Sequence, residues 1–176
     1  MEVYQAIMKR RSIRKYEDKP VTRDIIERLL RAAMQAPSAA NQRPWEFIIV
    51  QDREGLEKLS LAHPYAGPVK TAAAAILVLG KKEGMLFPQY WQQDLAAATQ
   101  NILLAAVEEG LGAVWTGIAP EEDRMAYIKK MFDLPDGVMP FALLALGFST
   151  GNVEHDRFDE ARIHYEKYKV DEAISK

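Results

Sequence analysis

The segment of residues 93–109 constrains the fold more than any other, because its middle, DLAAATQNILLAAV, is apolar on nearly every face of a helix. Gly110 follows this segment and is a typical helix stop. A helix of this kind must be covered on all sides, in a core or in an interface between subunits. The chain of 176 residues has the size of one domain, and we expect residues 1–176 to form a single domain.

Other segments have the spacing of amphipathic helices. Residues 22–37 begin with Thr22, a typical N-cap, and place apolar residues at helical intervals up to Pro37. Val3, Ala6 and Ile7 predict a shorter helix near the start of the chain. Residues 54–62 and 120–132 are further predicted helices, the second with a proline in its first turn.

Four short, mostly apolar runs are bounded by glycine, proline or polar turns, as buried strands are. They are residues 45–50, 74–80, 113–118 and 141–148. Together with the helices they predict a sheet covered by helices, whose strand directions the order of elements leaves open.

The composition excludes several kinds of chemistry. The absence of cysteine excludes disulfides, thiolate nucleophiles and iron–sulfur clusters, and the three histidines lack metal-ligand spacing, so we expect no metal site. The net charge of −2 gives no global basic field for nucleic acid or an anionic membrane. Because the apolar runs fall short of a span of ~20 residues, we expect a cytoplasmic protein with neither a membrane nor a nucleic-acid partner.

One segment is strongly basic although the net charge of the chain is slightly negative. Residues 9–15, KRRSIRK, hold five cations in seven positions around one hydroxyl. In an extended segment, Arg10, Ser12 and Arg14 lie on one side and offer the guanidinium and hydroxyl donors that phosphate recognition uses. The alternatives are a solvated basic loop and a module that binds anions or nucleic acid.

Two further segments have residues suited to a ligand. Residues 36–45, APSAANQRPW, combine a helix stop with hydroxyl and amide side chains that suit the mixed edge of a heteroaromatic ring, or an ordinary turn. Residues 109–117, EGLGAVWTG, have glycines that allow a ligand to approach a strand closely, or that end a helix. They are not a dinucleotide fingerprint, because Trp115 stands where the third glycine is needed.

Gly147, Ser149 and Gly151 match the GxSxG pattern of hydrolases, with Asp156 or Asp159 and then His164 following in hydrolase order. The residues after this motif do not begin an apolar helix, and too few follow for the usual spacing of a catalytic triad. We therefore interpret the match as accidental.

The order of these motifs resembles the FMN-dependent nitroreductase family over essentially the whole chain. Residues 10–16 match its R-[RH]-S-x-R-x-[FY] element, and residues 36–45 match A-P-S-x-x-N-x-Q-P-W, with Arg43 where glutamine is usual. Residues 94–107 and the glycine turn after them match the family's central interface helix and flavin-edge segment.

Near the end, Arg157 and the sequence IHYE at residues 163–166 match a late phosphate-contacting arginine and a V-H-x-E element. The resemblance implies an α+β nitroreductase-like fold, with a mainly antiparallel sheet flanked by helices, in an intertwined homodimer with FMN at the interface. The cofactor-binding residues that it implies are Arg10, Arg11, Ser12, Arg14, Pro37, Ser38, Ala39, Asn41, Leu111, Gly112, Val114, Trp115, Thr116 and Arg157.

The resemblance implies roles for these residues. The basic cluster and Arg157 hold the phosphate and ribityl chain, residues 37–41 of the partner subunit line the flavin ring, and the backbone of residues 111–116 meets the ring edge. Flavin N5 carries hydride from NAD(P)H to a nitroaromatic, quinone or similar flat acceptor by a ping-pong mechanism. No protein residue is then catalytic, although Arg14 stabilises the reduced flavin.

Two questions about specificity stay open at this point. The alternative within the family is a specialised dehydrogenase, dehalogenase or flavin-modifying enzyme. Residues 82–91, KEGMLFPQYW, are the expected substrate loop, or else a packed connector. The sequence does not choose between NADH and NADPH.

Overall fold

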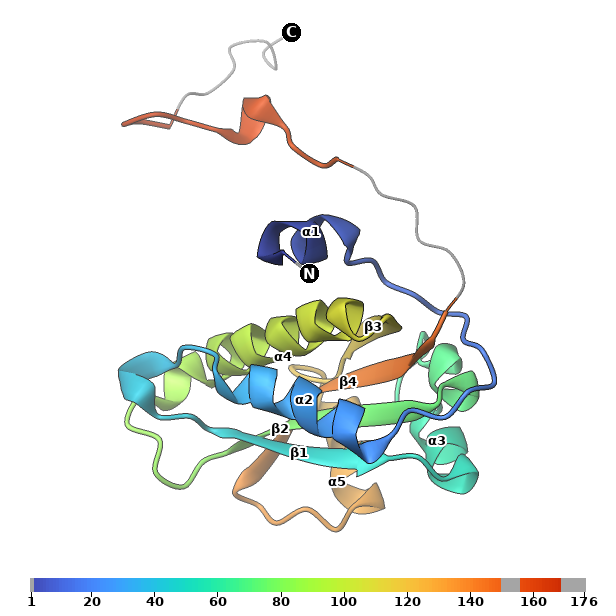
Figure 1. The fold of residues 1–176 in the computed structure, drawn as a ribbon. Helices are drawn as coiled ribbons and strands as arrows, with labels where there is room; N and C mark the ends of the chain where they lie inside the picture. Colours follow the sequence, from blue (N-terminus) through green and yellow to red (C-terminus); the bar gives the residue numbers. More distant parts are fainter. Residues whose placement is uncertain (1, 150–155, 169–176) are drawn as a thin grey trace, which may run out of the picture.

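The fold is described from a computed structural model, which covers residues 2–149 and 156–168. Four strands form one antiparallel sheet in the order β1-β2-β4-β3 (Figure 1). Their bounds are Trp45–Val50 for β1, Ala74–Lys81 for β2, Leu111–Gly117 for β3 and Val138–Phe148 for β4. The α+β class and the antiparallel sheet that the resemblance implied are therefore confirmed.

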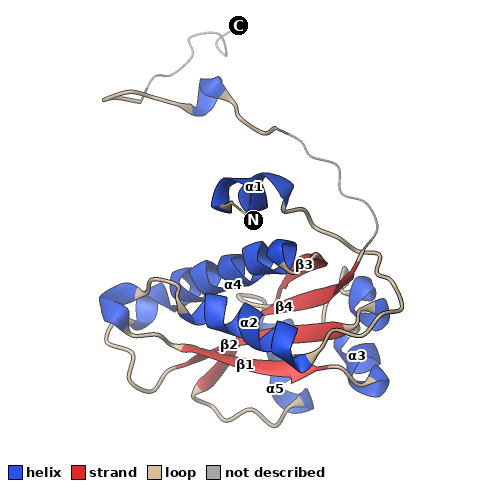
Figure 2. Cartoon of the chain, in the orientation of Figure 1, coloured by secondary structure: helices blue, strands red, loops and turns tan. Residues whose placement is uncertain are grey.

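Helices cover both faces of the sheet (Figure 2). Helices α2 (Arg23–Met34) and α4 (Trp91–Glu108) pack on one face, and α3 (Arg53–Leu59) and α5 (Glu122–Met131) pack on the other. The central strands have apolar residues throughout because alternate side chains enter opposite cores. In β2, for example, Ile76 lies in the α2–α4 core and Leu77 in the α3–α5 core.

The predicted strands are correct in kind, and β4 is longer than expected. It begins at Val138. Its Pro140 pairs with Leu79 of β2, and the register between the two strands shifts between Val78 and Leu79. Proline inside a strand is typical of such irregular positions, because it cannot donate a ladder hydrogen bond. A proline within an apolar run therefore masked the start of this strand.

The predicted helices are present, but α2 ends at Met34 and α3 at Leu59, each three residues before the predicted end, and the last one starts late. Thr22 caps α2, since its side chain accepts a hydrogen bond from the Ile25 N–H. The helix predicted for residues 120–132 begins only at Glu122, and Pro120 precedes it after a cis peptide bond. Pro120 is therefore not in the first turn. Among the described residues, no helix is both long and apolar enough to cross a membrane.

Helix α4 is covered only in part by its own chain. Leu95, Ala98 and Ile102 are fully buried against the sheet and α2, whereas Leu104 and Ala105 are half-buried. These two residues border a cavity of about 400 Å³ that the short helix α1 (Val3–Lys9) also lines. The apolar helix thus belongs to the core on one side and leaves apolar surface on the other.

Residues 156–168, here called the arm, extend away from the sheet in Figure 1. The arm holds one short 3₁₀ turn, Glu160–Arg162. Its aromatic side chains Phe158, Tyr165 and Tyr168 are 73%, 72% and 79% exposed. Large apolar groups in an extended segment are a feature of chains that pack on a second molecule.

Candidate functional site

Residues 10–16, here called the strap, run in extended form along the outer edge of β3. Ser12 forms a parallel bridge with Ala113, and the Ile13 N–H donates to the Ala113 carbonyl at 2.9 Å. The Tyr16 hydroxyl lies 3.2 Å from the carbonyl oxygen of Ala145 in the next strand. Two segments that the sequence singled out separately, the basic cluster and the glycine-containing strand, are therefore neighbours.

Gly112 allows the strap to lie this close. A Cβ atom on residue 112 would stand 2.5 Å from Ile13 Cγ2, well inside van der Waals contact. The close approach that this glycine permits is therefore that of the strap, where the sequence suggested a ligand. Because Ile13 faces β3, the side chains of Ser12 and Arg14 face the opposite way.

The backbone of β3 also has peptide groups at the same edge. The Ala113 carbonyl points away from β4, toward the strap. Peptide groups alternate in direction along a strand, so those of Trp115 point to the same edge, beyond the Ser12 bridge. Of the other predicted contacts, Leu111 and Val114 place their side chains in the two cores, and Thr116 is buried.

Arginines from both ends of the chain meet at one cavity. Arg10, Arg11 and Arg157 line a cavity of about 360 Å³ together with Gln100 of α4 and Asp156. Burial lowers the pKa of Arg10 from its ordinary value, and the charges of Arg157 and Arg11 lower it further. This electrostatic repulsion among guanidinium groups is what a bound anion would offset.

Ser12 and Arg14 lie on the strap outside this cavity. Both side chains are exposed, and Arg14 donates to the Ser12 carbonyl at 3.3 Å. They extend the donor surface from the cavity along the edge of β3. Of the three residues that the sequence pattern placed on one segment, Arg10 lines the cavity, and Ser12 and Arg14 are exposed on the strap.

The loop of residues 37–43, here called the Ser38 loop, has an unusual backbone. Ala40, Asn41 and Arg43 have positive φ angles of 46°, 55° and 46°, which side chains other than glycine rarely adopt. The Ser38 hydroxyl accepts a hydrogen bond from the Arg43 N–H at 2.9 Å and closes the loop. Strained backbone of this kind is typical of functional loops that their surroundings hold in place.

A buried carboxylate, Asp94 in the first turn of α4, holds the other side of the Ser38 loop. Its Oδ1 accepts from the Ala39 N–H at 2.8 Å, and its Oδ2 accepts from Gln42 Nε2 at 2.6 Å. Asp94 is only 5% exposed. Sequence reasoning considered the Gln42 amide for a ligand ring or a turn, whereas the structure turns it toward Asp94 and Phe87. It missed Asp94, although an acidic residue at the start of an apolar helix was a usable signal.

Pro37, Ser38, Ala39 and Asn41 thus lie together, but apart from the arginine cavity. Their loop contacts the beginning of α4, whereas the cavity lies at Gln100 and α1. Within the described parts of the chain, none of these four residues lines that cavity. Arg43, which replaces the usual glutamine, folds its side chain back toward the Asn41 carbonyl.

Residues 82–91 have features of both a substrate loop and a packed connector, the two interpretations that the sequence left open. Trp91 packs edge-on against Phe141 with ring centroids 6.0 Å apart, as a packed connector would. Leu86, Phe87 and Tyr90 are instead exposed, and the rings of the last two lie 6.5 Å apart. The exposed aromatic pair is available to a flat ligand.

The residues of the accidental hydrolase pattern have other partners. The Ser149 hydroxyl lies beside Gly112, Asp159 pairs with Arg162, and His164 lies against the Tyr168 ring at 4.2 Å. Gly151 is outside the described residues. These contacts give Asp159 and His164 local structural roles in the arm.

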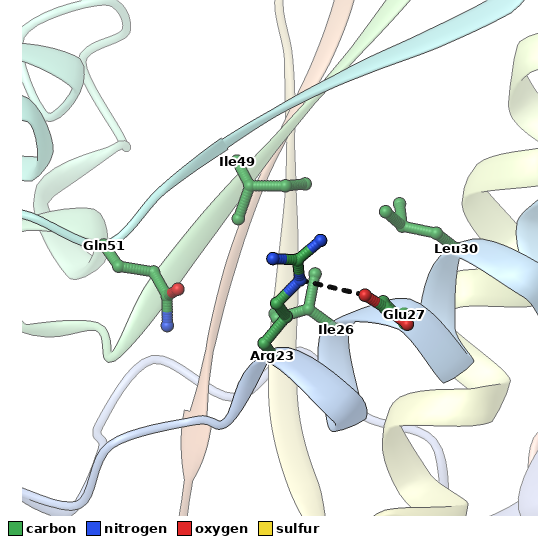
Figure 3. Close-up of a pocket in the computed structure, with 6 residues that line it drawn as sticks. All are labelled: Arg23, Ile26, Glu27, Leu30, Ile49 and Gln51. Atoms are coloured by element: carbon green, nitrogen blue, oxygen red, sulfur yellow. Dashed lines mark hydrogen bonds and ion pairs between the residues drawn. The ribbon is translucent and has the colours of Figure 1, made fainter.

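A larger cavity of about 530 Å³ lies elsewhere, between α2 and the edge strand β1. Figure 3 shows the Arg23–Glu27 ion pair beside the apolar side chains Ile26, Leu30 and Ile49. No cofactor residue that the sequence predicted lines this cavity. The arginine cavity and the Ser38 loop therefore remain the candidate site.

Comparison with known proteins decides the family. The sequence profile described as the Nitroreductase family matches residues 7–85 and 62–148. The chain belongs to the nitroreductase family. A relative from Methanothermobacter thermautotrophicus, provisionally named NADH dehydrogenase/NAD(P)H nitroreductase, is 48% identical over 169 residues, which are 96% of this chain and 88% of that protein.

Solved nitroreductase structures have the same fold. A crystal structure provisionally named NADH oxidase, from Clostridium acetobutylicum, has a TM-score of 0.91 and 50% identity, covering 93% of this chain and 99% of that chain. An FMN-dependent nitroreductase from Clostridium difficile has a TM-score of 0.86 and 29% identity, covering 93% and 98%. A nitroreductase, also provisionally named, from Desulfovibrio desulfuricans in complex with FMN has a TM-score of 0.82 and 31% identity, covering 96% and 98%. The resemblance to this family of oxidoreductases is confirmed.

Proposed function

We propose that this nitroreductase is a single-domain, FMN-dependent oxidoreductase that passes hydride from NAD(P)H to a flat conjugated acceptor, such as a nitroaromatic or a quinone. The observation that carries the proposal is the meeting of Arg10 and Arg157 at one cavity, beside the strap. The FMN bound in one solved family member supports the identity of the cofactor.

The residues present fit the phosphate end of FMN. Arg10, Arg11 and Arg157 offer forked donors to a dianion, and their mutual repulsion is relieved when that dianion binds. Asp156 also lines the cavity, so the local charge is positive without being purely basic. Ser12 and Arg14 continue the donor surface along the strap toward the ribityl chain.

The remaining residues orient the ring and tune its surroundings. When bound, FMN supplies the hydride-accepting and hydride-donating chemistry. The Trp115 peptide groups face the edge where the ring would lie, and the Arg14 charge offsets negative charge that develops there. Donor and acceptor then take turns at one open face, so no protein nucleophile is needed.

We propose that two copies of the chain build each site. The Ser38 loop is separated from the arginine cavity within one chain, so a partner subunit must bring Pro37, Ser38, Ala39 and Asn41 to the ring. The exposed aromatic arm and the half-covered side of α4 give such a partner apolar surface to cover.

The visible spectrum of the purified protein tests this function. We expect a yellow protein that retains FMN and loses its colour when NADH or NADPH is added without oxygen. A nitroaromatic or quinone should then restore the colour. A colourless protein that does not take up added FMN, or a yellow one that neither nicotinamide bleaches, would contradict the proposal.

A further inference from the structure

The side-chain amide of Gln42 joins the Ser38 loop to the exposed aromatic segment at residues 86–90. Gln42 Oε1 accepts from the Phe87 N–H at 3.0 Å, and Gln42 Nε2 lies 3.2 Å from the Phe87 carbonyl oxygen. One amide group therefore pairs with both backbone groups of Phe87, as a neighbouring strand would.

Asp94 fixes the direction of that amide. An ionised carboxylate only accepts hydrogen bonds, so the amide nitrogen of Gln42 must face Asp94 Oδ2, at 2.6 Å. The amide oxygen is thereby turned toward the Phe87 N–H. A hydrogen bond to a buried carboxylate is charge-assisted, so this orientation is firmly held.

The same carboxylate also holds the Ser38 loop through the Ala39 N–H. Asp94 thus connects two loops: one that is strained and predicted to line the flavin, and one that exposes Phe87 and Tyr90. The rings of these two residues are near each other, so the position of Phe87 decides the position of an aromatic surface. A flat acceptor binds such a surface by stacking.

We propose that Gln42, oriented by Asp94, is a positioning residue that sets how flat aromatic acceptors bind, by fixing Phe87 next to the Ser38 loop. This inference rests on the proposed function for its substrate class. It assigns no contact with substrate to Gln42 itself. It does assign the aromatic wall of the acceptor site to Phe87 and Tyr90.

The first test measures amide hydrogen exchange of Phe87 in the protein as purified. Gln42→Leu removes both hydrogen bonds to Phe87, and exchange at this amide should rise about three- to tenfold. Asp94→Asn leaves one acceptor oxygen for two donors, the Ala39 N–H and the Gln42 amide, and should also raise exchange. Gln92→Leu, an equivalent change at an exposed glutamine near the start of α4, is the matched control and should leave exchange unchanged.

A paired exchange of side chains provides the rescue. In the double variant Gln42→Glu with Asp94→Asn, the new amide nitrogen at residue 94 donates to the new carboxylate, whose other oxygen accepts from Phe87. The Ala39 N–H still has an oxygen acceptor. This double variant rebuilds the bond from the Phe87 N–H but gives the Phe87 carbonyl no donor, so it should restore exchange part of the way to the wild-type rate. Gln42→Glu alone places two carboxylates together and should restore nothing.

The second test compares two electron acceptors with the FMN-loaded enzyme. Gln42→Leu should raise KM for a nitrobenzene derivative about three- to tenfold, while kcat/KM for ferricyanide, which has no ring to stack, stays at the wild-type value. The rescue variant should bring the nitroaromatic KM back toward the wild-type value. Unchanged Phe87 exchange, an unchanged nitroaromatic KM, or equal losses with both acceptors would overturn the inference. A wild-type enzyme that nicotinamide does not reduce would instead refute the proposed function.

Discussion

Ile13 of the strap fills the space that a side chain on Gly112 of β3 would need. Their contact brings the basic cluster to the sheet edge, since the Ile13 Cγ2 and Cβ atoms lie 2.5 and 2.7 Å from where a Cβ on residue 112 would stand. Neither atom is the far end of a flexible side chain, so the strap itself would have to move. The glycine is therefore required by packing between two parts of the candidate site.

Gly112→Ala should displace the strap. We expect a loss of about 1–3 kcal/mol in the free energy of unfolding, typical of an overpacked position, and weaker FMN retention. Urea unfolding and equilibrium dialysis measure these two quantities. Gly137→Ala is the matched control, because a Cβ there meets nothing within 4 Å. Equal stability of the two variants would contradict the packing argument.

Arg10→Ala and Arg157→Ala should each weaken FMN binding about ten- to a hundredfold, the effect of losing a charge-assisted hydrogen bond to phosphate. The stability of the flavin-free protein should not fall in Arg157→Ala, because that change removes a charge that lowers the pKa of Arg10. Fluorescence titration with FMN and thermal unfolding of the apoprotein check both effects. Lys15→Ala, which removes an exposed cation nearby, is the control. FMN binding at wild-type affinity in both arginine variants would refute the phosphate assignment.

Stability should depend on pH through Glu109. Arg28 binds this carboxylate at 2.6 and 2.7 Å and holds its pKa below the ordinary value. A lowered folded-state pKa adds stability above the unfolded-state pKa, and this stability is lost as pH falls through the folded-state value. Glu109→Gln should therefore lower Tm at pH 7, and this effect should shrink as the pH falls below the ordinary carboxyl pKa of about 4.3.

The partner of Glu109 supplies the control. Arg28→Met should lower Tm at pH 7 by a similar amount, and the double variant should lose no more than either single variant. A difference between wild type and Glu109→Gln that is as large at pH 3 as at pH 7 would show that the pair does not cause the effect.

Steady-state kinetics should show that donor and acceptor exchange at one site. Initial rates measured against NAD(P)H at several acceptor concentrations should give parallel double-reciprocal lines, because each ligand must leave before the other binds. Intersecting lines, or a stable complex with both ligands bound, would rule out alternating occupancy.

Two defective chains should complement each other if each site uses both subunits. A heterodimer of Arg10→Ala with Asn41→Ala holds one site with both defects and one site with neither. Mixing and refolding the two variants should therefore produce a fraction of sites with wild-type flavin affinity, which neither homodimer has. Co-refolding with no gain over the separate variants would refute the shared site.

Much of the fold was predictable, because its signals are local. A few neighbouring residues are enough to recognise the apolar run of β2 (Ala74–Lys81) and the Thr22 cap of α2. The beginning of β4 was not predictable, because a proline such as Pro140 normally argues against a strand. It is tolerated here beside the irregular register between β2 and β4, which the sequence does not reveal. The position of α5 after Pro120 likewise depends on a turn that propensity does not specify.

The candidate site was predictable as a set of segments but not as an arrangement. The motifs at residues 10–16 and 36–45 drew attention through charge and side-chain chemistry. Which other segments these motifs contact depends on tertiary pairing, such as the bridge between Ser12 and Ala113. The periodicity of the sequence does not predict such pairing. The pairing of Gln42 with Asp94 was not predicted, because the two residues are 52 positions apart and meet only in the folded chain.

The distance between the Ser38 loop and the arginine cavity within one chain has a kinetic consequence. If two copies must meet before either site is whole, the gain of colour during refolding is a second-order process whose half-time doubles each time the protein concentration is halved. The fluorescence of Trp45, which belongs to the buried core, should recover at a rate independent of concentration. In dilute solution the chain would therefore fold well before it becomes a flavoprotein.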